Sequence, residues 1–247
     1  MNSYKEHAAV WDWDGFDNSD EYKYWCSYAE KFGNKVLIPM CALGQAGSYL
    51  AQRGFTVTGI DITNEMIHEG IKRYGHIKNL FLKVADICNM QLSEREFDFT
   101  FLSSQDLHLL ADMNMVKNAF ISIANHLRKG ACLVLELILP SSESYNIPTQ
   151  TYHPRVANYT DKKIWKEGQS RYDAITKRHY IDQIIFIDDG NNISSFKHSI
   201  ILQYFELSDI IKTLCEANFK INGIFINRNR EPWNEHENEI IIEALKM

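Results

Sequence analysis

The chain has no apolar run long enough to cross a membrane, no C-x-x-C pair and no H-x-x-x-H spacing. The first absence argues against a membrane-spanning protein, and the other two remove the local signatures of a zinc site. Its five cysteines are odd in number and widely spaced, which predicts reduced thiols rather than a disulfide framework. The first fourteen residues are polar and acidic, unlike a secretory signal. We therefore expect a cytoplasmic protein with no membrane partner and no bound metal.

Basic residues are also in the minority, because 26 lysines and arginines face 32 aspartates and glutamates, for a net charge of -6. A protein that binds nucleic acid generally needs a basic stripe to displace counterions from phosphates, so no nucleic-acid partner is expected. Hydrophobic residues make up 45% of the 247 positions, which is enough to bury one core. We expect a single domain over residues 1–247, present as a monomer or a homodimer.

The most informative segment alternates strand, turn, helix and strand between residues 36 and 61. Apolar residues 36–39 predict a strand, small residues 40–44 a turn, and residues 55–60 a second strand that ends at Asp61. In an open parallel sheet, ligands bind beyond the carboxyl ends of the strands, and an acid there can hold both hydroxyls of a ribose. The segment therefore predicts a cofactor that carries a nucleoside. An ordinary strand–helix–strand unit without a ligand is the alternative.

Two kinds of cofactor suit such a segment, and the glycine pattern separates them. A nicotinamide dinucleotide site needs G-x-G-x-x-G, and the best register here, Ala42, Gly44 and Gly47, lacks the first glycine. The segment more closely resembles the first motif of the class I S-adenosylmethionine-dependent methyltransferases, in which three glycines alternate with other residues. Met40 and Ala42 replace the first two of these glycines, and Gly44 keeps the third. The Ile-Pro-Met-Cys-Ala sequence also resembles the turn of the thiopurine-methyltransferase branch.

The rest of the chain continues the alternation and sets the expected fold. Residues 80–84, 97–102 and 132–138 read as further strands with helices between them, which predicts an α/β, doubly wound sheet. The resemblance implies a Rossmann-like, mostly parallel seven-stranded sheet whose final strand is antiparallel. It also implies an N-terminal helical lid over residues 1–33 and a substrate-side insertion over residues 141–206.

The insertion has two parts. Residues 180–187 and 194–205 alternate β-forming residues around a turn-rich segment, which predicts a β-hairpin inserted after strand five. Residues 141–180 show no regular spacing of apolar residues but are rich in aromatic and basic residues, as in a lid or binding loop. The resemblance implies that the insertion encloses the acceptor, and five residues are expected to bind substrate: Tyr145, Tyr152, Arg171, Tyr172 and Tyr180. The alternative is that such side chains are ordinary core and surface material.

The resemblance also implies the cofactor, S-adenosylmethionine, with S-adenosylhomocysteine as its product. Asp61 is expected to bind the ribose and Asp86 the adenine amino group, while Ile87 packs against the ring. The alternative for Asp86 is an acid that caps a loop. The full set expected to bind the cofactor is Tyr4, Trp11, Met40, Ala42, Gly44, Asp61, Ile62, Met66, Asp86, Ile87 and Ser103.

Strand four ends beside the sulfonium in this superfamily, so the residues that follow it are candidates for catalysis. His108 is the expected general base, and Asp106 is expected to orient it or to bind an ammonium group. The alternative is that residues 107–110 begin a helix in which His108 is satisfied locally.

These features predict methyl transfer to a small molecule or short peptide, with nitrogen favoured over oxygen or sulfur as the acceptor. A second hypothesis is a non-methylating enzyme of the same fold, for example one that cyclises the cofactor's aminobutyrate part. The altered turn at 38–42 motivates it, because this turn touches the region that holds the cofactor's amino-acid end. A nicotinamide oxidoreductase is the third hypothesis, and the incomplete glycine pattern disfavours it.

Overall fold

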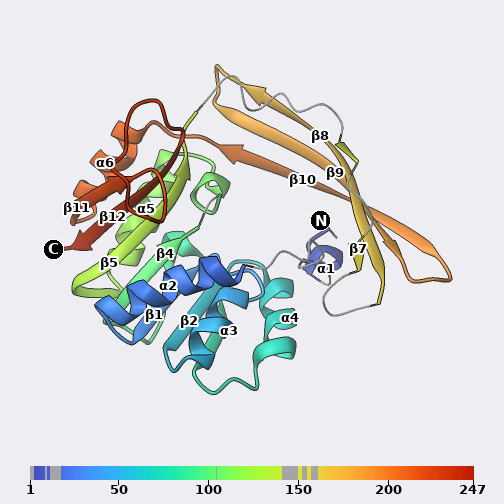
Figure 1. The fold of residues 1–247 in the computed structure, drawn as a ribbon, viewed down its shortest axis with the longest axis horizontal. Coiled ribbons are helices and arrows are strands. Elements are labelled where there is room, and N and C mark those ends of the chain that lie inside the picture. Colours follow the sequence, from blue (N-terminus) through green and yellow to red (C-terminus); the bar gives the residue numbers. More distant parts are fainter. Residues whose placement is uncertain are drawn as a thin grey trace.

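The computed structural model describes residues 3–8, 10–11, 18–103, 105–140, 150–151, 155–156 and 161–247. Tyr145 and Tyr152, which are expected to bind substrate, lie outside these ranges. The described part consists of an α/β unit and an antiparallel sheet that projects from it (Figure 1). None of its helices combines the length and the apolar character that a membrane span requires.

The α/β unit is built on a seven-stranded sheet with the order β11-β12-β5-β4-β1-β2-β3. Strands β1 to β5 run parallel, and β12 pairs antiparallel with both β5 and β11. This arrangement confirms the predicted doubly wound sheet with an antiparallel final strand. The strands are β1 (Lys35–Pro39), β2 (Thr56–Asp61), β3 (Leu80–Val84), β4 (Phe97–Leu102), β5 (Leu127–Ile138), β11 (Phe219–Phe225) and β12 (Glu239–Lys246).

Helices cover both faces of this sheet. Trp25 of α2 is fully buried on one face, where its ring stacks on Phe101 of β4 with the centroids 4.1 Å apart. Phe120 of α5 is buried in the cluster on the other face. Because both faces are covered, the central strands read as continuous apolar runs. The helical segments of this unit are α2 (Ser19–Phe32), α3 (Gln45–Gln52), α4 (Asn64–Tyr74), η1 (Ile87–Asn89), η2 (Leu107–Leu109), α5 (Met113–Ala124) and α6 (Leu207–Glu216).

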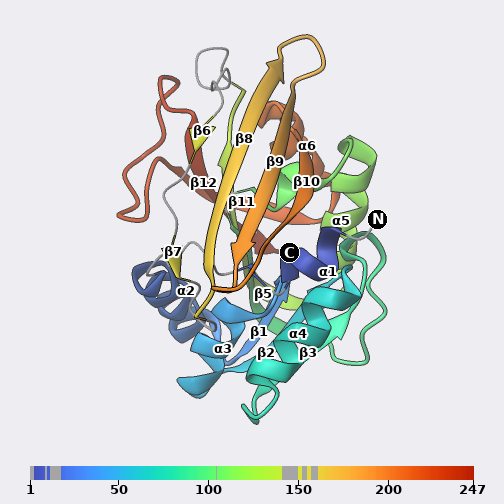
Figure 2. The ribbon, with the colours of Figure 1, turned by 90° about the vertical axis from the view of Figure 1, so that its right-hand side faces the viewer.

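The insertion forms the second sheet, whose three long strands cross in front of the α/β unit in Figure 2. The predicted hairpin is confirmed as β9 (Arg178–Asp188) and β10 (Ile193–Gln203), which pair antiparallel. The segment expected to lack regular structure contributes a third long strand, β8 (Lys163–Asp173), which pairs with β9 and with the short β6 (Gln150–Thr151) and β7 (Arg155–Val156). Polar residues on both faces of β8 hide its alternation, so periodicity alone missed it.

Helix α1 (Ser3–Ala8) lies between the two sheets and contacts both α4 and β10 (Figure 1). Ala8 packs against Met66 of the α/β unit, whereas Val10, just after the helix, packs against Ile164 of the insertion. Helix α2, in the same N-terminal segment, packs in the core of the α/β unit. The role of residues 1–33 as a lid stays a prediction.

Candidate active site

The turn after β1 takes an unusual backbone path. Met40, Ala42 and Gly44 have φ angles of 54°, 48° and 83°, so every second residue is left-handed. At Gly44 an added Cβ would also lie 2.6 Å from a methyl group of Leu82. The left-handed conformation costs a residue with a side chain roughly 1–2 kcal/mol. Met40 and Ala42 are therefore strained, at positions where the first motif of the class I methyltransferases has glycine. Strain of this kind is concentrated at ligand-binding sites.

Asp61, at the end of β2, is held by this turn. Its Oδ2 accepts a hydrogen bond from the Ala42 N–H at 3.0 Å, and its Oδ1 accepts one from the Thr63 N–H at 2.8 Å. Each carboxylate oxygen retains a free lone pair after these bonds. Asp61 is therefore an oriented acceptor at the carboxyl edge of the sheet, as a ribose site requires.

Two exposed apolar side chains flank Asp61. Ile62 is 69% exposed, and Val84, whose backbone pairs with Asp61 at the end of β3, is 51% exposed. Apolar side chains beside a polar anchor suit the flat face of a base. Ile62 belongs to the predicted set, whereas Val84 was missed because at the sequence level it reads only as the last residue of a strand.

The predicted adenine residues are arranged differently. The Oδ1 of Asp86 accepts the Cys88 N–H at 2.8 Å and so caps η1, which is the structural alternative considered for this acid. Ile87 is buried in the main core. Binding of adenine by these two residues stays a prediction.

Other predicted cofactor residues lie around α1. Tyr4 is in the helix, and Met66 is buried beneath it beside Leu43. Trp11 is 37% exposed, with its ring 4.9 Å from that of His7. The helix thus covers the turn that holds Asp61, and a direct contact of these side chains with cofactor stays a prediction.

Asp106 follows β4 and accepts two hydrogen bonds from Ser103, at 2.9 Å from its N–H and 3.2 Å from its hydroxyl. Burial, together with the charges of Asp61 and Glu21, raises the pKa of Asp106 to about 7, although the Ser103 hydrogen bonds oppose the shift. Its carboxyl group therefore changes protonation near neutral pH, which is the property of a residue that exchanges a proton. Ser103, expected to bind cofactor, holds Asp106 in this structure.

His108 is 2% exposed and uses both of its ring nitrogens. Nε2 accepts the Ile138 N–H at 3.1 Å, which leaves Nδ1 protonated to donate to the Gln203 carbonyl at 3.0 Å. Burial lowers the pKa of His108 to about 4. The imidazole is thus neutral and joins η2 to the ends of β5 and β10. This geometry does not support His108 as a general base, so that role stays a prediction without structural support.

The predicted substrate residues of the insertion lie on opposite faces of its sheet. Tyr172 lies on the side that faces the α/β unit, and its ring centroid is 6.0 Å from that of Tyr204. Arg171 and Tyr180 are register partners on the other side, with the guanidinium 4.3 Å from the ring centroid. The structure therefore brings Tyr172 toward the carboxyl edge of the main sheet and points Arg171 and Tyr180 away from it.

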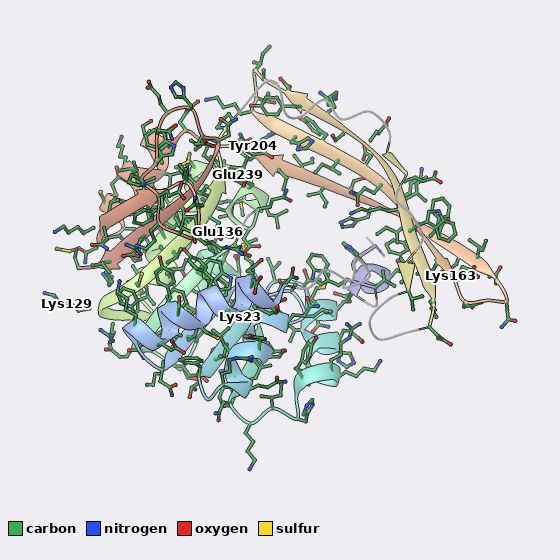
Figure 3. The ribbon with its side chains drawn as sticks, viewed as in Figure 1. Lys23, Lys129, Glu136, Lys163, Tyr204 and Glu239 are labelled. Carbon is green, nitrogen blue, oxygen red and sulfur yellow. The ribbon has the colours of Figure 1, made fainter. Side chains whose placement is uncertain are left out.

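One group of residues near the site has no counterpart in the sequence prediction. Arg228, in the loop after β11, donates from Nε to Oε1 of Glu136 on β5 at 3.0 Å and lies 3.4 Å from Oε2 of Glu21 on α2. Glu21 is also one of the charges that act on Asp106. Figure 3 shows Glu136 close to the junction of the two sheets. These residues are far apart in the chain and form no local motif, so a linear reading could not group them.

The chain is similar to known methyltransferases. Residues 36–130 match the model of a methyltransferase domain. The YqeM protein of Bacillus subtilis (strain 168) is 20% identical over 205 residues that cover 83% of this chain and 81% of YqeM.

Solved structures share the fold over nearly the whole chain. An S-adenosylmethionine-dependent methyltransferase from Clostridium acetobutylicum ATCC 824 matches with a TM-score of 0.78 at 18% identity and covers 99% of each chain. The sugar N-methyltransferase KedS8 from Streptoalloteichus sp ATCC 53650 matches with a TM-score of 0.75 at 14% identity, over 94% of this chain and 89% of KedS8. At such identities the structures establish the fold.

Residues 36–130 thus resemble a methyltransferase domain, and the solved structures share the fold of the whole described chain. The likeness to the thiopurine-methyltransferase branch is not confirmed and stays a prediction.

Proposed function

We propose that this methyltransferase transfers the methyl group of S-adenosylmethionine to a nitrogen atom of a small molecule or short peptide. The observation that carries the proposal is Asp106, an acid with a pKa near 7 at the end of β4, beside the oriented carboxylate of Asp61. One carboxylate is fixed by backbone N–H groups and suits binding, and the other is poised to exchange a proton.

The binding half of the mechanism follows from the residues around Asp61. Its two free lone pairs accept the ribose hydroxyls, and Ile62 and Val84 cover the base. Helix α1 closes over the turn and excludes water. The cofactor supplies a methyl group activated by positive sulfur. Holding the acceptor in line with it can contribute on the order of 7–11 kcal/mol through proximity alone.

The proton-transfer half assigns a role to Asp106. An amine acceptor is protonated near neutral pH and must lose a proton before its lone pair can attack carbon. The ionised Asp106 carboxylate accepts that proton, a role that typically contributes about 10²–10⁴-fold. The carboxylate form prevails above its pKa of about 7, so turnover should rise with pH through this value.

Structural neighbours favour nitrogen as the acceptor atom. They include the sugar N-methyltransferase KedS8 and a glycopeptide N-methyltransferase. Of the predicted substrate residues, we propose Tyr172 as the one that contacts the acceptor, because its ring lies on the side of the α/β unit, near Tyr204. No observation favours the non-methylating alternative.

Calorimetry with S-adenosylhomocysteine, followed by mass spectrometry of the cofactor products formed with a panel of amines, tests the proposal. We expect binding, and release of S-adenosylhomocysteine only when an amine is supplied. Methylthioadenosine as the product would instead indicate cleavage or cyclisation of the cofactor and would overturn the proposal.

A further inference from the structure

A pocket of about 430 Å³ lies where β5 ends and β12 begins. Half of the residues that line it are leucine or isoleucine, and the other half are polar or charged: Glu136, Asn227, Arg228, Asn229 and Glu239. Figure 3 shows Glu239 close to Tyr204, at the junction of the two sheets, and Glu136 below them in the α/β unit, whereas Lys129 lies at the far edge of that unit. A concave site in which apolar side chains and several polar groups converge can hold a small molecule.

The pocket adjoins the position proposed for methyl transfer. Ile138, in its lining, donates its N–H to Nε2 of His108 at 3.1 Å, and His108 lies two residues after Asp106. A molecule whose amine reaches Asp106 can therefore place its remaining atoms in this pocket.

The charges that line the pocket do not balance. Arg228 is committed to Glu136, at 3.0 Å, and to Glu21. Glu239 is exposed and, among the described residues, has no cationic partner. A surplus of carboxylate attracts cations and repels anions, even where the attraction is moderated by water.

The amides in the lining add hydrogen-bonding capacity. Oδ1 of Asn227 accepts the Asn229 N–H at 3.0 Å, so its NH₂ group remains available as a donor. Donors of this kind beside carboxylate acceptors match hydroxyl groups, which both donate and accept.

We propose that this pocket holds the non-reacting part of the acceptor, and that the acceptor is a hydroxyl-bearing cationic amine without an anionic group. The inference rests on the proposed function, because the pocket is assigned to the remaining atoms of the amine whose nitrogen gives its proton to Asp106. Glu239 is the residue that determines specificity for charge.

Three small nitroxides that differ in charge test this inference without any methyl transfer. These are 4-amino-TEMPO, a cation at neutral pH, the neutral 4-hydroxy-TEMPO and the anionic 4-carboxy-TEMPO. Paramagnetic broadening is measured on isoleucine δ1 methyl groups of the full chain. The pocket provides Ile138 and Ile226, which are half-buried in its lining, as reporters. Ile71 and Ile175, which are 50% and 95% exposed elsewhere, report non-specific encounters.

We expect the cation to broaden the pocket methyls about fivefold more than the neutral probe, and the anion to broaden them least. Glu239→Gln should remove most of this preference. Glu235→Gln is the matched control, because it removes a carboxylate from the same loop but outside the pocket lining, and it should leave the preference intact.

Three results would overturn the inference. The cation and the neutral probe could broaden the pocket methyl groups equally, or Glu239→Gln and Glu235→Gln could change the preference equally. The third is broadening of Ile71 and Ile175 to the same extent as the pocket methyl groups. Calorimetry with S-adenosylhomocysteine separates this failure from that of the proposed function. If the nucleoside binds and the probes show no preference, only the inference falls. If the nucleoside does not bind, the proposed function falls, and the probe result still decides the charge preference of the pocket.

Discussion

The two halves of the candidate active site are held together in different ways. On the cofactor side, Asp61 is fixed by backbone N–H groups of Ala42 and Thr63, all within one strand–helix–strand unit. On the acceptor side, Glu21 and Arg228 come from opposite ends of the chain and meet through side-chain charges. Backbone contacts tolerate many substitutions, whereas side-chain ion pairs do not. Replacing Ala42 or Thr63 should therefore leave the backbone N–H groups that hold Asp61 in place, whereas replacing Glu21 or Arg228 removes the contact itself.

The largest effect should come from Asp61→Ala. The variant loses two charge-assisted hydrogen bonds to the ribose, worth about 1.5–3 kcal/mol each, so affinity for S-adenosylhomocysteine should fall at least about a hundredfold. Calorimetry measures the affinity, and thermal unfolding checks that the variant is folded. Normal affinity in a folded variant would show that the nucleoside does not bind at the end of β2.

A second variant tests the junction between the halves. His108→Ala removes a buried ring and the hydrogen bonds to Ile138 and Gln203, so the free energy of unfolding should fall by about 2–4 kcal/mol. Urea unfolding measures this loss, and His108→Asn, which can still donate to the Gln203 carbonyl, should recover part of it. Unchanged stability with turnover abolished would restore His108 as the general base.

A smaller effect is expected from Glu21→Gln on the acceptor side. The charge of Glu21 raises the pKa of Asp106, so removing that charge should lower this pKa and move the acid limb of turnover to lower pH. We expect about a twofold gain in the ratio of turnover at pH 6 to turnover at pH 8, with cofactor affinity unchanged. The control, Glu30→Gln at the exposed far end of α2, should leave the pH profile in place. A limb that does not move would remove Asp106 from the mechanism.

The smallest effect should come from Ala42→Gly. Glycine relieves the left-handed strain at this position but adds freedom to the unfolded chain, so the net gain in stability should be about 1 kcal/mol or less. Urea unfolding measures it. The same change at Ala46, in α3, should destabilise the protein, because glycine weakens a helix. Destabilisation at both positions would show that the turn is not strained.

Asp106 and His108 show where prediction from sequence succeeds and where it fails. Both follow β4, and their proximity to the site was expected from the resemblance to class I methyltransferases, in which the fourth strand ends beside the sulfonium. Which of them can exchange a proton depends on their surroundings. Hydrogen bonds from the distant Ile138 and to Gln203 occupy His108, while the charges of Asp61 and Glu21 act on Asp106. Sequence spacing carries no information on such partners.

The sequence alone determined the parallel core of the fold, the turn after β1 and the acid that ends β2, because these depend on short-range periodicity and on residues close together in the chain. The tertiary structure decided the rest. It selected which face of the insertion Tyr172, Arg171 and Tyr180 occupy, and it joined Arg228 to Glu136 and Glu21. Strand register and long-range ion pairs arise from packing between distant segments, so only the folded chain defines the acceptor side.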